Sequence, residues 1–387
     1  MAEAFERYCE VPLVPDSSTS LLESLVKIPS VCGDEYKIAA FIRNWLAERC
    51  LPAEFMEVKP SRPNVVCRLK GPSDGPRLLL NGHMDTVAIG EGWVHDPYGA
   101  KIEDGRMYGR GTIDMKSGLA SILVAAAECK QEGLPAKGEL IVAAVVDEES
   151  IDWGTYALVQ KGVTKGVDLA FVSEATNLNL ATAHRGRTVF DVEVHGRAAH
   201  SMWPEHGVSA IDSAATLIKS LPKLNSPTHP RLGRSTVNVL KIEGGQVEVM
   251  LVPERCRVVI DRCLVPGHNS KSALEELKQL IKGIGVNADV KFIDRETPFC
   301  EPFEIPDNDR NVQMALGAVT KVLGKAPKLD FHPGPCDSCI LVDPGGVPTL
   351  EFGPSGGRLH ESDEFVELDS VGKTTTVYKE IIKTMLS

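Results

Sequence analysis

Four short apolar runs in this chain lead to acidic residues or histidines, three of them within a few residues and the fourth through a Gly-rich loop, and this pattern limits the possible folds more than any other feature. Stretches with apolar residues at helical spacing lie among the runs. Strands that alternate with helices predict an α/β fold with a largely parallel sheet. The predicted buried strands are Leu78–Leu80, Leu140–Val146, Leu169–Val172 and Val347–Phe352, with a fifth at Val65–Leu69, and the predicted helices are Ala39–Leu46, Lys116–Cys129, Val312–Leu323 and Val371–Leu386.

The middle of the chain has a different pattern, in the order β-α-β-β-α-β. This order predicts a small ferredoxin-like α+β domain inserted into the larger one. The expected boundaries are residues 1–184 for the first segment of the large domain, 185–295 for the insert and 296–387 for the second segment. The predicted elements of the insert are Thr188–Val194, Ser209–Ile218, Thr236–Ile242, Arg257–Val265, Ser272–Ile284 and Val286–Ile293.

Composition excludes several classes of partner. The net charge is -11 and there is no basic run, so a nucleic acid is not expected to bind. The start of the chain lacks the pattern of a secretory signal, and no apolar stretch approaches the roughly 20 residues that cross a bilayer, so we expect a cytoplasmic protein without a membrane partner. Its 10 cysteines are therefore expected to be reduced. Plain buried thiols are favoured over a redox role for the CxxC pair Cys336 and Cys339.

The polar residues that follow the predicted strands should meet in one place, because the carboxyl ends of parallel strands lie at the same edge of a sheet. A further acid, Asp114, comes just before a predicted helix. The residues after the strands are His83 and Asp85, Glu148 and Glu149, Glu174, and His360.

Two histidines and several carboxylates form a set of ligands that zinc accepts, and one carboxylate can bridge two ions. So many acids in one crevice would repel each other without a cation. Taken singly, each motif has a plainer interpretation, such as a turn with a hydrogen-bonded histidine or a solvated loop end. Four clusters that each follow an apolar strand favour a metal site.

The motifs together resemble the co-catalytic zinc hydrolases, a family that includes acetylornithine deacetylase, succinyl-diaminopimelate desuccinylase, aminoacylase and glutamate carboxypeptidase. The resemblance runs from about Leu21 to the C-terminus in the family's order. It rests on GHMDTV, WVHDPYGAKIEDGRMYGRGTIDMKSG, DEES, SEAT, HRGRTVFDVEVHGRAAHS and LHESDEF.

The resemblance implies two zinc ions, for which cobalt or manganese could substitute. It implies that Asp85 orients the imidazole of His83, and that Glu148 is the general base that takes a proton from water and passes it to the leaving nitrogen. The implied ligands are His83 and Glu174 on one ion, Glu149 and His360 on the other, and Asp114 on both.

The insert resembles the lid through which two subunits of this family pair, which implies a homodimer. His200 in AAHS resembles the histidine that stabilises the oxyanion, and Asn238 in STVNVLKIEGG resembles an asparagine that contacts substrate. From the residues alone, both would be ordinary strand or loop residues.

The sequence departs from the family in places. SEAT replaces a more usual Glu-Pro pair, and Cys263 stands where many relatives have an arginine that grips a substrate carboxylate. The adjacent Arg262 should point to the opposite face of the strand. Arg358, near His360, is either a replacement anchor or a solvated loop charge, and the sequence does not favour one over the other.

These observations predict an enzyme that removes an N-acyl group from an amino acid or a related small molecule. Glu174 supports this function, because the aminopeptidase and dipeptidase branches more often resemble Asp at that position. A metallo-carboxypeptidase or dipeptidase is the alternative among enzymes. From another class, the chain could be a metal-binding partner protein that has lost catalysis, but an intact Glu148 argues against that.

Overall fold

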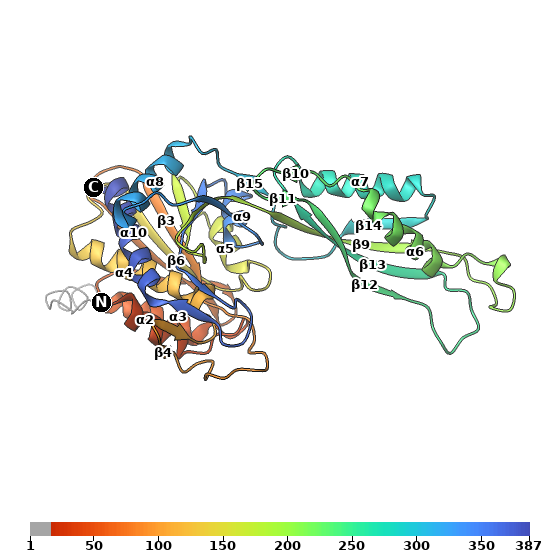
Figure 1. Cartoon of the computed structure of the whole chain (residues 1–387), viewed down its shortest axis with the longest axis horizontal. Coiled ribbons are helices and arrows are strands. Elements are labelled where there is room, and N and C mark those ends of the chain that lie inside the picture. Colours follow the sequence, from red (N-terminus) through yellow and green to blue (C-terminus); the bar gives the residue numbers. More distant parts are fainter. Residues whose placement is uncertain (1–16) are drawn as a thin grey trace. The chain divides into compact units, whose positions relative to one another are not determined.

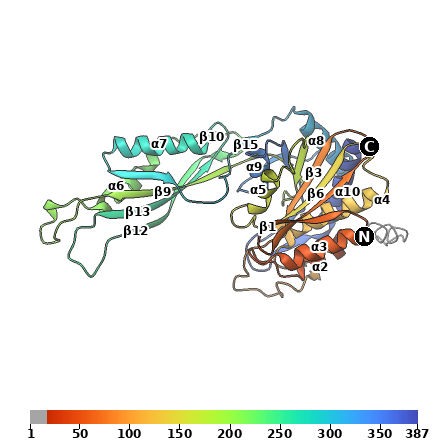
Figure 2. The same cartoon turned by 180° about the vertical axis from the view of Figure 1, so that it is seen from behind.

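The structure, a computed structural model, describes residues 17–387. The segment on which the prediction about a secretory signal rests therefore lies outside the described residues. The chain forms two compact units (Figures 1 and 2). The second unit comprises Ala183–Glu304 and Pro333–Pro335, and the first contains the described residues up to Thr182 together with Ile305–His332 and Cys336–Ser387.

The first unit is built on a mixed sheet with the strand order β1-β2-β6-β3-β7-β17-β8, beside which β16 pairs with β8. Its centre is parallel, because β3 runs parallel to both β6 and β7, and β17 runs parallel to β7. The outer strands β1, β2 and β8 are antiparallel to their neighbours. The strands are β1 (Ala53–Lys59), β2 (Arg62–Lys70), β3 (Arg77–His83), β6 (Glu139–Val145), β7 (Leu169–Val172), β8 (Leu180–His184), β16 (Leu329–His332) and β17 (Thr349–Glu351).

Helices cover both faces of this sheet (Figure 1). Along β3, Leu78 and Leu80 pack into the core under α2, α3, α4, α8 and α10, whereas Leu79 packs with α5 and α9 on the other face. This alternation follows from the period of two along a strand. The helices are α2 (Ser18–Val26), α3 (Tyr36–Glu48), α4 (Ser117–Gln131), α5 (Trp153–Gln160), α8 (Arg310–Leu323), α9 (Asp337–Val342) and α10 (Leu368–Leu386).

The predicted α/β fold class is confirmed. The four apolar runs that are followed by polar motifs correspond to β3, β6, β7 and β17, which are the parallel strands at the centre. The fifth run lies in β2, whose pairing with β6 is antiparallel. A small antiparallel sheet, which the sequence did not predict, has the order β18-β19-β5-β4. Its strands are β4 (Lys101–Glu103), β5 (Arg106–Tyr108), β18 (Gly356–Gly357) and β19 (Phe365–Glu367).

The second unit has the predicted β-α-β-β-α-β order, with an antiparallel sheet arranged β12-β13-β9-β14. The two helices pack on one face of it, against alternate residues such as Phe190, Val192, Val258 and Ile260. This arrangement is the ferredoxin-like fold. The elements are β9 (Gly186–His195), α6 (Ala210–Ser220), β12 (Thr236–Gly244), β13 (Arg255–Leu264), α7 (Ser270–Gly283) and β14 (Ala288–Phe292), with the short strands β10 (Thr228–His229), β11 (Gly233–Arg234) and β15 (Phe303–Glu304).

The expectation that all cysteines are reduced is wrong. Cys50, Cys300 and Cys339 are disulfide-bonded. Because Cys336 keeps its thiol, the two cysteines of the CxxC motif are not bonded to each other. Burial raises the pKa of Cys336 well above its usual value, so this thiol is poorly suited to redox exchange. Within residues 17–387, no helix is both long and apolar enough to cross a membrane.

Candidate metal centre

His83 ends β3 with its side chain fully buried. Its Nδ1 lies 3.0 Å from the backbone oxygen of Asp85 and donates a hydrogen bond to it. This hydrogen bond orients the ring so that the other nitrogen, Nε2, faces a cluster of carboxylates. Nε2 lies 3.1 Å from Asp114 Oδ1 and 3.5 Å from Glu174 Oε1. Glu174 follows β7, so two neighbouring parallel strands supply His83 and Glu174, whereas Asp114 comes from the segment before α4.

Asp85 lies next to His83 and is fully buried. The structure places its carboxylate 3.7 Å from Nδ1 of His83, so its backbone oxygen is the nearer partner of the imidazole. The carboxylate instead accepts hydrogen bonds from the backbone N–H groups of Glu148 (3.3 Å) and Glu149 (3.0 Å). Burial raises the pKa of Asp85 to about 7. Asp85 therefore connects the loop after β3 to the turn after β6.

Asp114 lies between the two histidines of the cluster. One oxygen, Oδ1, is 3.1 Å from His83 Nε2, and the other, Oδ2, is 3.1 Å from His360 Nε2. Burial alone would raise the pKa of Asp114, but hydrogen bonds from His360 and His83 lower it below its usual range. Each oxygen thus faces a different imidazole, which is the arrangement that a bridging carboxylate needs.

His360 comes from the loop after β18 and is half exposed, with 52% of its side-chain surface accessible. Its Nε2 also lies 3.0 Å from Glu149 Oε2. Hydrogen bonds to Asp114 and Glu149 raise the pKa of His360 to about 10. The other carboxylate oxygen of Glu149 is buried and has no hydrogen-bond partner among the described residues. An orphaned carboxylate oxygen beside an imidazole is a feature that a cation would satisfy.

Glu148 lies on the side of His83, with Oε2 3.8 Å from Nε2 of that histidine. Burial raises the pKa of Glu148 well above its usual value, and it also raises the pKa of Glu174. For His83, burial alone would lower the pKa, but the hydrogen bond to Asp114 and the nearby carboxylates raise it well above its usual value. The carboxylates of this cluster thus favour the protonated form of His83, and that of His360 as well.

The geometry fits divalent metal ions. Ligand atoms about 2.0–2.1 Å from a tetrahedral zinc ion lie roughly 3.3 Å from one another. The distances from Nε2 of His83 or His360 to the carboxylate oxygens of their predicted co-ligands range from 3.0 to 3.5 Å. One atom each of His83, Asp114 and Glu149 also lies within 4.8 Å of the others. The structure thus brings together all five predicted ligands, with Asp85 and Glu148 beside them.

His200 and Asn238, by contrast, belong to the second unit. His200 is exposed, its Nδ1 accepts a hydrogen bond from the backbone of Met202 at 3.2 Å, and its ring packs near Trp203. Asn238 is exposed on β12, where it lies opposite Asp261 of β13. Their predicted roles at the active site stay predictions.

Arg358 lies in the same loop as His360 and has 54% of its side-chain surface exposed. Its Nη1 is 3.7 Å from Asp363 Oδ2, and it donates a hydrogen bond to the backbone oxygen of Ser362 at 3.5 Å. These contacts are weak, so the guanidinium keeps donors available for another partner.

Glu364 supports the cluster but was not predicted from the sequence. It is buried, and it accepts hydrogen bonds from the backbone N–H groups of Gly111, Ile113 and Asp114 at 3.0–3.3 Å. It also pairs with the buried Arg110 at 2.7 Å. Glu364 therefore holds the loop that presents the bridging Asp114. The available signal was the acidic pair of Asp363 and Glu364 near the end of the LHESDEF motif.

A second group with metal-type ligands lies behind the turn after β6, and it consists of Cys32, Glu35 and Asp147. Arg62 already fills this group, because its guanidinium contacts both Glu35 and Asp147. The positive charge that these acids need is therefore supplied by the protein itself.

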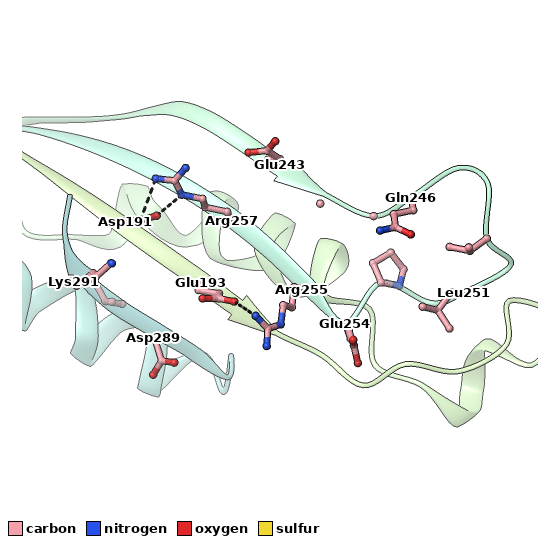
Figure 3. Close-up of a pocket in the computed structure, with 15 residues that line it drawn as sticks. Asp191, Glu193, Glu243, Gln246, Leu251, Glu254, Arg255, Arg257, Asp289 and Lys291 are labelled. Atoms are coloured by element: carbon pink, nitrogen blue, oxygen red, sulfur yellow. Dashed lines mark hydrogen bonds and ion pairs between the residues drawn. The ribbon is translucent and has the colours of Figure 1, made fainter. Parts of the chain in front are cut away.

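A hollow of about 960 Å³ lies on the face of the second unit's sheet opposite the helices (Figure 3). Ion pairs cross it from β9 to β13, with Arg257 2.7 Å from Asp191 and Arg255 3.0 Å from Glu193. These charges satisfy one another. The candidate metal centre is therefore the cluster in the first unit.

Comparison with known proteins gives a consistent result. The model of peptidase family M20/M25/M40 matches residues 79–384. A succinyl-diaminopimelate desuccinylase from Cereibacter sphaeroides is 27% identical over 383 residues, which cover 96% of this chain and 99% of that protein.

Two solved structures share the fold. Aminopeptidase PepT from Bacillus cereus superposes with a TM-score of 0.79 at 22% identity and covers 97% of this chain and 100% of its own. YXEP from Bacillus subtilis, described as a dinuclear metal binding peptidase from the M20 family, superposes with a TM-score of 0.73 at 18% identity and covers 99% of both chains.

Proposed function

Because this chain belongs to peptidase family M20/M25/M40, we propose that it removes an N-acyl group, such as succinyl or acetyl, from an amino acid or a related small molecule with the help of two zinc ions. Family membership makes it a metal-dependent hydrolase that acts on amide or peptide bonds. The acyl group, the substrate class and the identity of the metal are the proposed part.

One observation carries the proposal: Asp114 lies between His83 and His360, with one carboxylate oxygen directed to each. When bound, two zinc ions would lower the pKa of water and polarise the carbonyl of the amide. The residues that would hold them are His83 and Glu174 for one ion, Glu149 and His360 for the other, and Asp114 for both.

Glu148 is the residue that moves the proton. Its carboxylate would accept a proton from the water that attacks the amide carbonyl, and would then donate that proton to the nitrogen of the departing amine. A general base works best when its pKa lies near the operating pH. The buried surroundings that raise the pKa of Glu148 therefore suit both halves of this transfer.

The preference for an N-acyl substrate over a peptide rests on the relative from Cereibacter sphaeroides, which is named a succinyl-diaminopimelate desuccinylase and matches over nearly its whole length. The deciding experiment is a turnover assay of zinc-loaded protein on N-succinyl and N-acetyl amino acids and on dipeptides, with products identified by mass spectrometry. We expect kcat/KM for at least one N-acyl amino acid to exceed that for every dipeptide tenfold. The reverse order would favour the peptidase alternative, and two-zinc protein that turns over neither class would reject both.

The same assay tests Arg358 as the anchor of a substrate carboxylate. The guanidinium is half exposed and makes only weak contacts, so it is available for an anion. We expect Arg358→Ala to raise KM about tenfold for substrates that end in a carboxylate and to leave KM for the matching carboxamides unchanged. Arg310→Ala, which removes an exposed arginine at the start of α8, is the control. Equal changes for both substrate forms would mean that Arg358 is only a loop charge.

The active enzyme is proposed to be a homodimer in which His200 of one chain stabilises the oxyanion in the other. Two features support pairing through the second unit. The outer edge of β12 pairs with no other strand of residues 17–387, and Leu240 and Ile242 on this strand are each 50% exposed. An exposed apolar edge strand favours pairing with another chain. An oxyanion donor of this kind contributes about 3 kcal/mol.

Complementation tests this arrangement. His200→Ala and Glu148→Gln chains, each nearly inactive alone, are mixed until mass spectrometry shows subunit exchange. Half of the dimers are then mixed, and each mixed dimer carries one intact composite site, so about a quarter of wild-type activity should return in a two-fold symmetric dimer. Confirmed exchange without recovered activity would show that His200 does not act across an interface.

A further inference from the structure

Glu148 and Glu149 lie on a turn with a constrained backbone. The preceding residue, Asp147, has a φ of 70°, in the left-handed region that non-glycine residues seldom adopt. The backbone oxygen of Asp147 accepts hydrogen bonds from Ile151 and Asp152, at 3.2 and 2.8 Å, which close the turn. A left-handed residue persists only where its surroundings hold it in place. The contacts of Asp147 therefore bear on where the two glutamates point.

The side chain of Asp147 is held by Arg62, the first residue of β2. Arg62 Nη2 lies 2.6 Å from Asp147 Oδ1 and 2.5 Å from Glu35 Oε1, and Nε lies 2.7 Å from Glu35 Oε2. The side chains are 16% exposed for Arg62, 5% for Asp147 and 0% for Glu35. One guanidinium thus pairs with two buried carboxylates at once, a geometry that the planar fork of arginine provides and lysine does not.

Glu35 connects this ion pair to the loop that follows His83 and carries Asp85. Its Oε1 accepts a hydrogen bond from the backbone of Gly33 at 2.8 Å. The same segment pairs by its backbone with the residues after His83, because Cys32 donates to Thr86 at 3.0 Å and Thr86 donates to Ser30 at 2.9 Å.

The two loops are therefore tied together on two sides. On the inner side, the carboxylate of Asp85 accepts the backbone N–H groups of Glu148 and Glu149. On the outer side, Arg62 joins Glu35 to Asp147. If the outer connection were removed, two buried acids would be left without a cation. The remaining side-chain ties between the two loops would be the Asp85 carboxylate and a 3.5 Å contact from the Cys32 thiol to Asp147.

We propose that Arg62 is a positioning residue of the enzyme: through Asp147 it fixes the turn that carries the predicted base Glu148 and the predicted metal ligand Glu149. This inference rests on the proposed function of the cluster. It assigns a role to a residue that touches neither substrate nor metal, and the role is exerted through the backbone of the turn.

The variants are Arg62→Ala, which removes the guanidinium, and Asp147→Asn, which keeps the shape of the side chain but removes its charge. Arg68→Ala is the matched control, because Arg68 lies on the same strand and pairs with Glu139 at 3.2 Å near its far end. Replacement of a residue that supports metal ligands from behind costs about 10–100-fold in metal affinity or activity. We expect Arg62→Ala to lower kcat about 30-fold with KM within about twofold, and Arg68→Ala to leave both unchanged.

Cobalt binding gives a readout that does not depend on turnover. Titration of the metal-free protein with Co²⁺, followed by visible absorption, should show one of two binding steps weakened about tenfold in Arg62→Ala, with altered band shapes, and no change in Arg68→Ala. The double variant with Asp147→Asn should be no worse in kcat than Arg62→Ala alone, since both changes break the same contact. Ethylguanidinium added to Arg62→Ala should restore part of kcat and of the wild-type cobalt spectrum.

The outcomes separate the two proposals. If Arg62→Ala lowers the melting temperature but keeps the kcat and cobalt spectrum of wild type, Arg62 is only a stabilising ion pair and the inference is wrong. If Arg62→Ala does not fold, the single variants Asp147→Asn and Arg62→Lys and their double variant replace it. We then expect the losses of kcat not to add, because both changes act on one contact, and additive losses would overturn the inference. If wild-type protein binds no cobalt and turns over no substrate, the proposed function itself fails.

Discussion

Replacing Glu148 by glutamine should abolish turnover while both metal ions stay bound. Glutamine has nearly the same shape and can still accept a hydrogen bond, but it cannot take a proton from the attacking water. General acid–base catalysis contributes roughly 10²–10⁴-fold, so kcat should fall by about that factor while KM changes little. Single-turnover kinetics with zinc-loaded Glu148→Gln, together with metal analysis of the same sample, measure both parts of this expectation.

A matched control separates the loss of the base from a general effect of the mutation. Glu54 lies exposed on the outer strand β1, and Glu54→Gln should keep wild-type kcat and metal content. A Glu148→Gln variant that retains more than about a tenth of wild-type kcat would show that another group accepts the proton. Loss of metal from this variant would instead identify Glu148 as a ligand.

Two zinc ions should bind per chain, and their removal should eliminate activity. The cluster offers two imidazoles and the carboxylates of Asp114, Glu149 and Glu174 within 3.0–3.5 Å of them. The hydrogen bond to Asp114 with the nearby carboxylates raises the pKa of His83, and hydrogen bonds to Asp114 and Glu149 raise the pKa of His360 to about 10, so both imidazoles favour their protonated forms without metal. Zinc must displace these protons, so its apparent affinity should fall as the pH is lowered below that pKa.

Elemental analysis of freshly purified protein and activity after dialysis against a chelator test this prediction. The double variant His83→Ala with Glu149→Ala removes one ligand from each ion and should lose most of the zinc. A change at an exposed histidine outside the cluster, His206→Ala, should keep it. Full activity in chelator-treated protein with no measurable metal would be incompatible with the proposed chemistry.

The part of the candidate metal centre that lies at strand ends could be predicted from the sequence because it follows a rule of α/β sheets. Glu174 and the pair after β6 come directly after parallel strands, where the chain must leave the sheet at one edge. The fold of the second unit could also be predicted, because apolar and polar residues alternate with a period of two along its strands.

The supporting residues could not be predicted, because no local pattern marks them. Glu35, Arg62 and Asp147 are separated by 27 and 85 positions, and only the packed fold brings them together. Glu364 reaches the Asp114 loop across about 250 residues. The role expected for the Asp85 carboxylate was also altered by packing, because the carboxylate binds the backbone of the next turn while its own carbonyl oxygen orients His83.

The position of β17 has a consequence for the order in which the protein can be made. This strand lies between β7 and β8, yet nearly 180 residues of chain separate it from β7. As the polypeptide emerges from the ribosome, β7 and β8 cannot pair with β17 until residue 351 has been synthesised. Every strand of the second unit's main sheet has been synthesised before that point. Because domains generally fold as units during synthesis, the second unit can be finished first. Until β17 is synthesised, the sheet of the first unit lacks a central strand, and the apolar residues beside that position are exposed. At this stage a molecular chaperone would find apolar surface to bind.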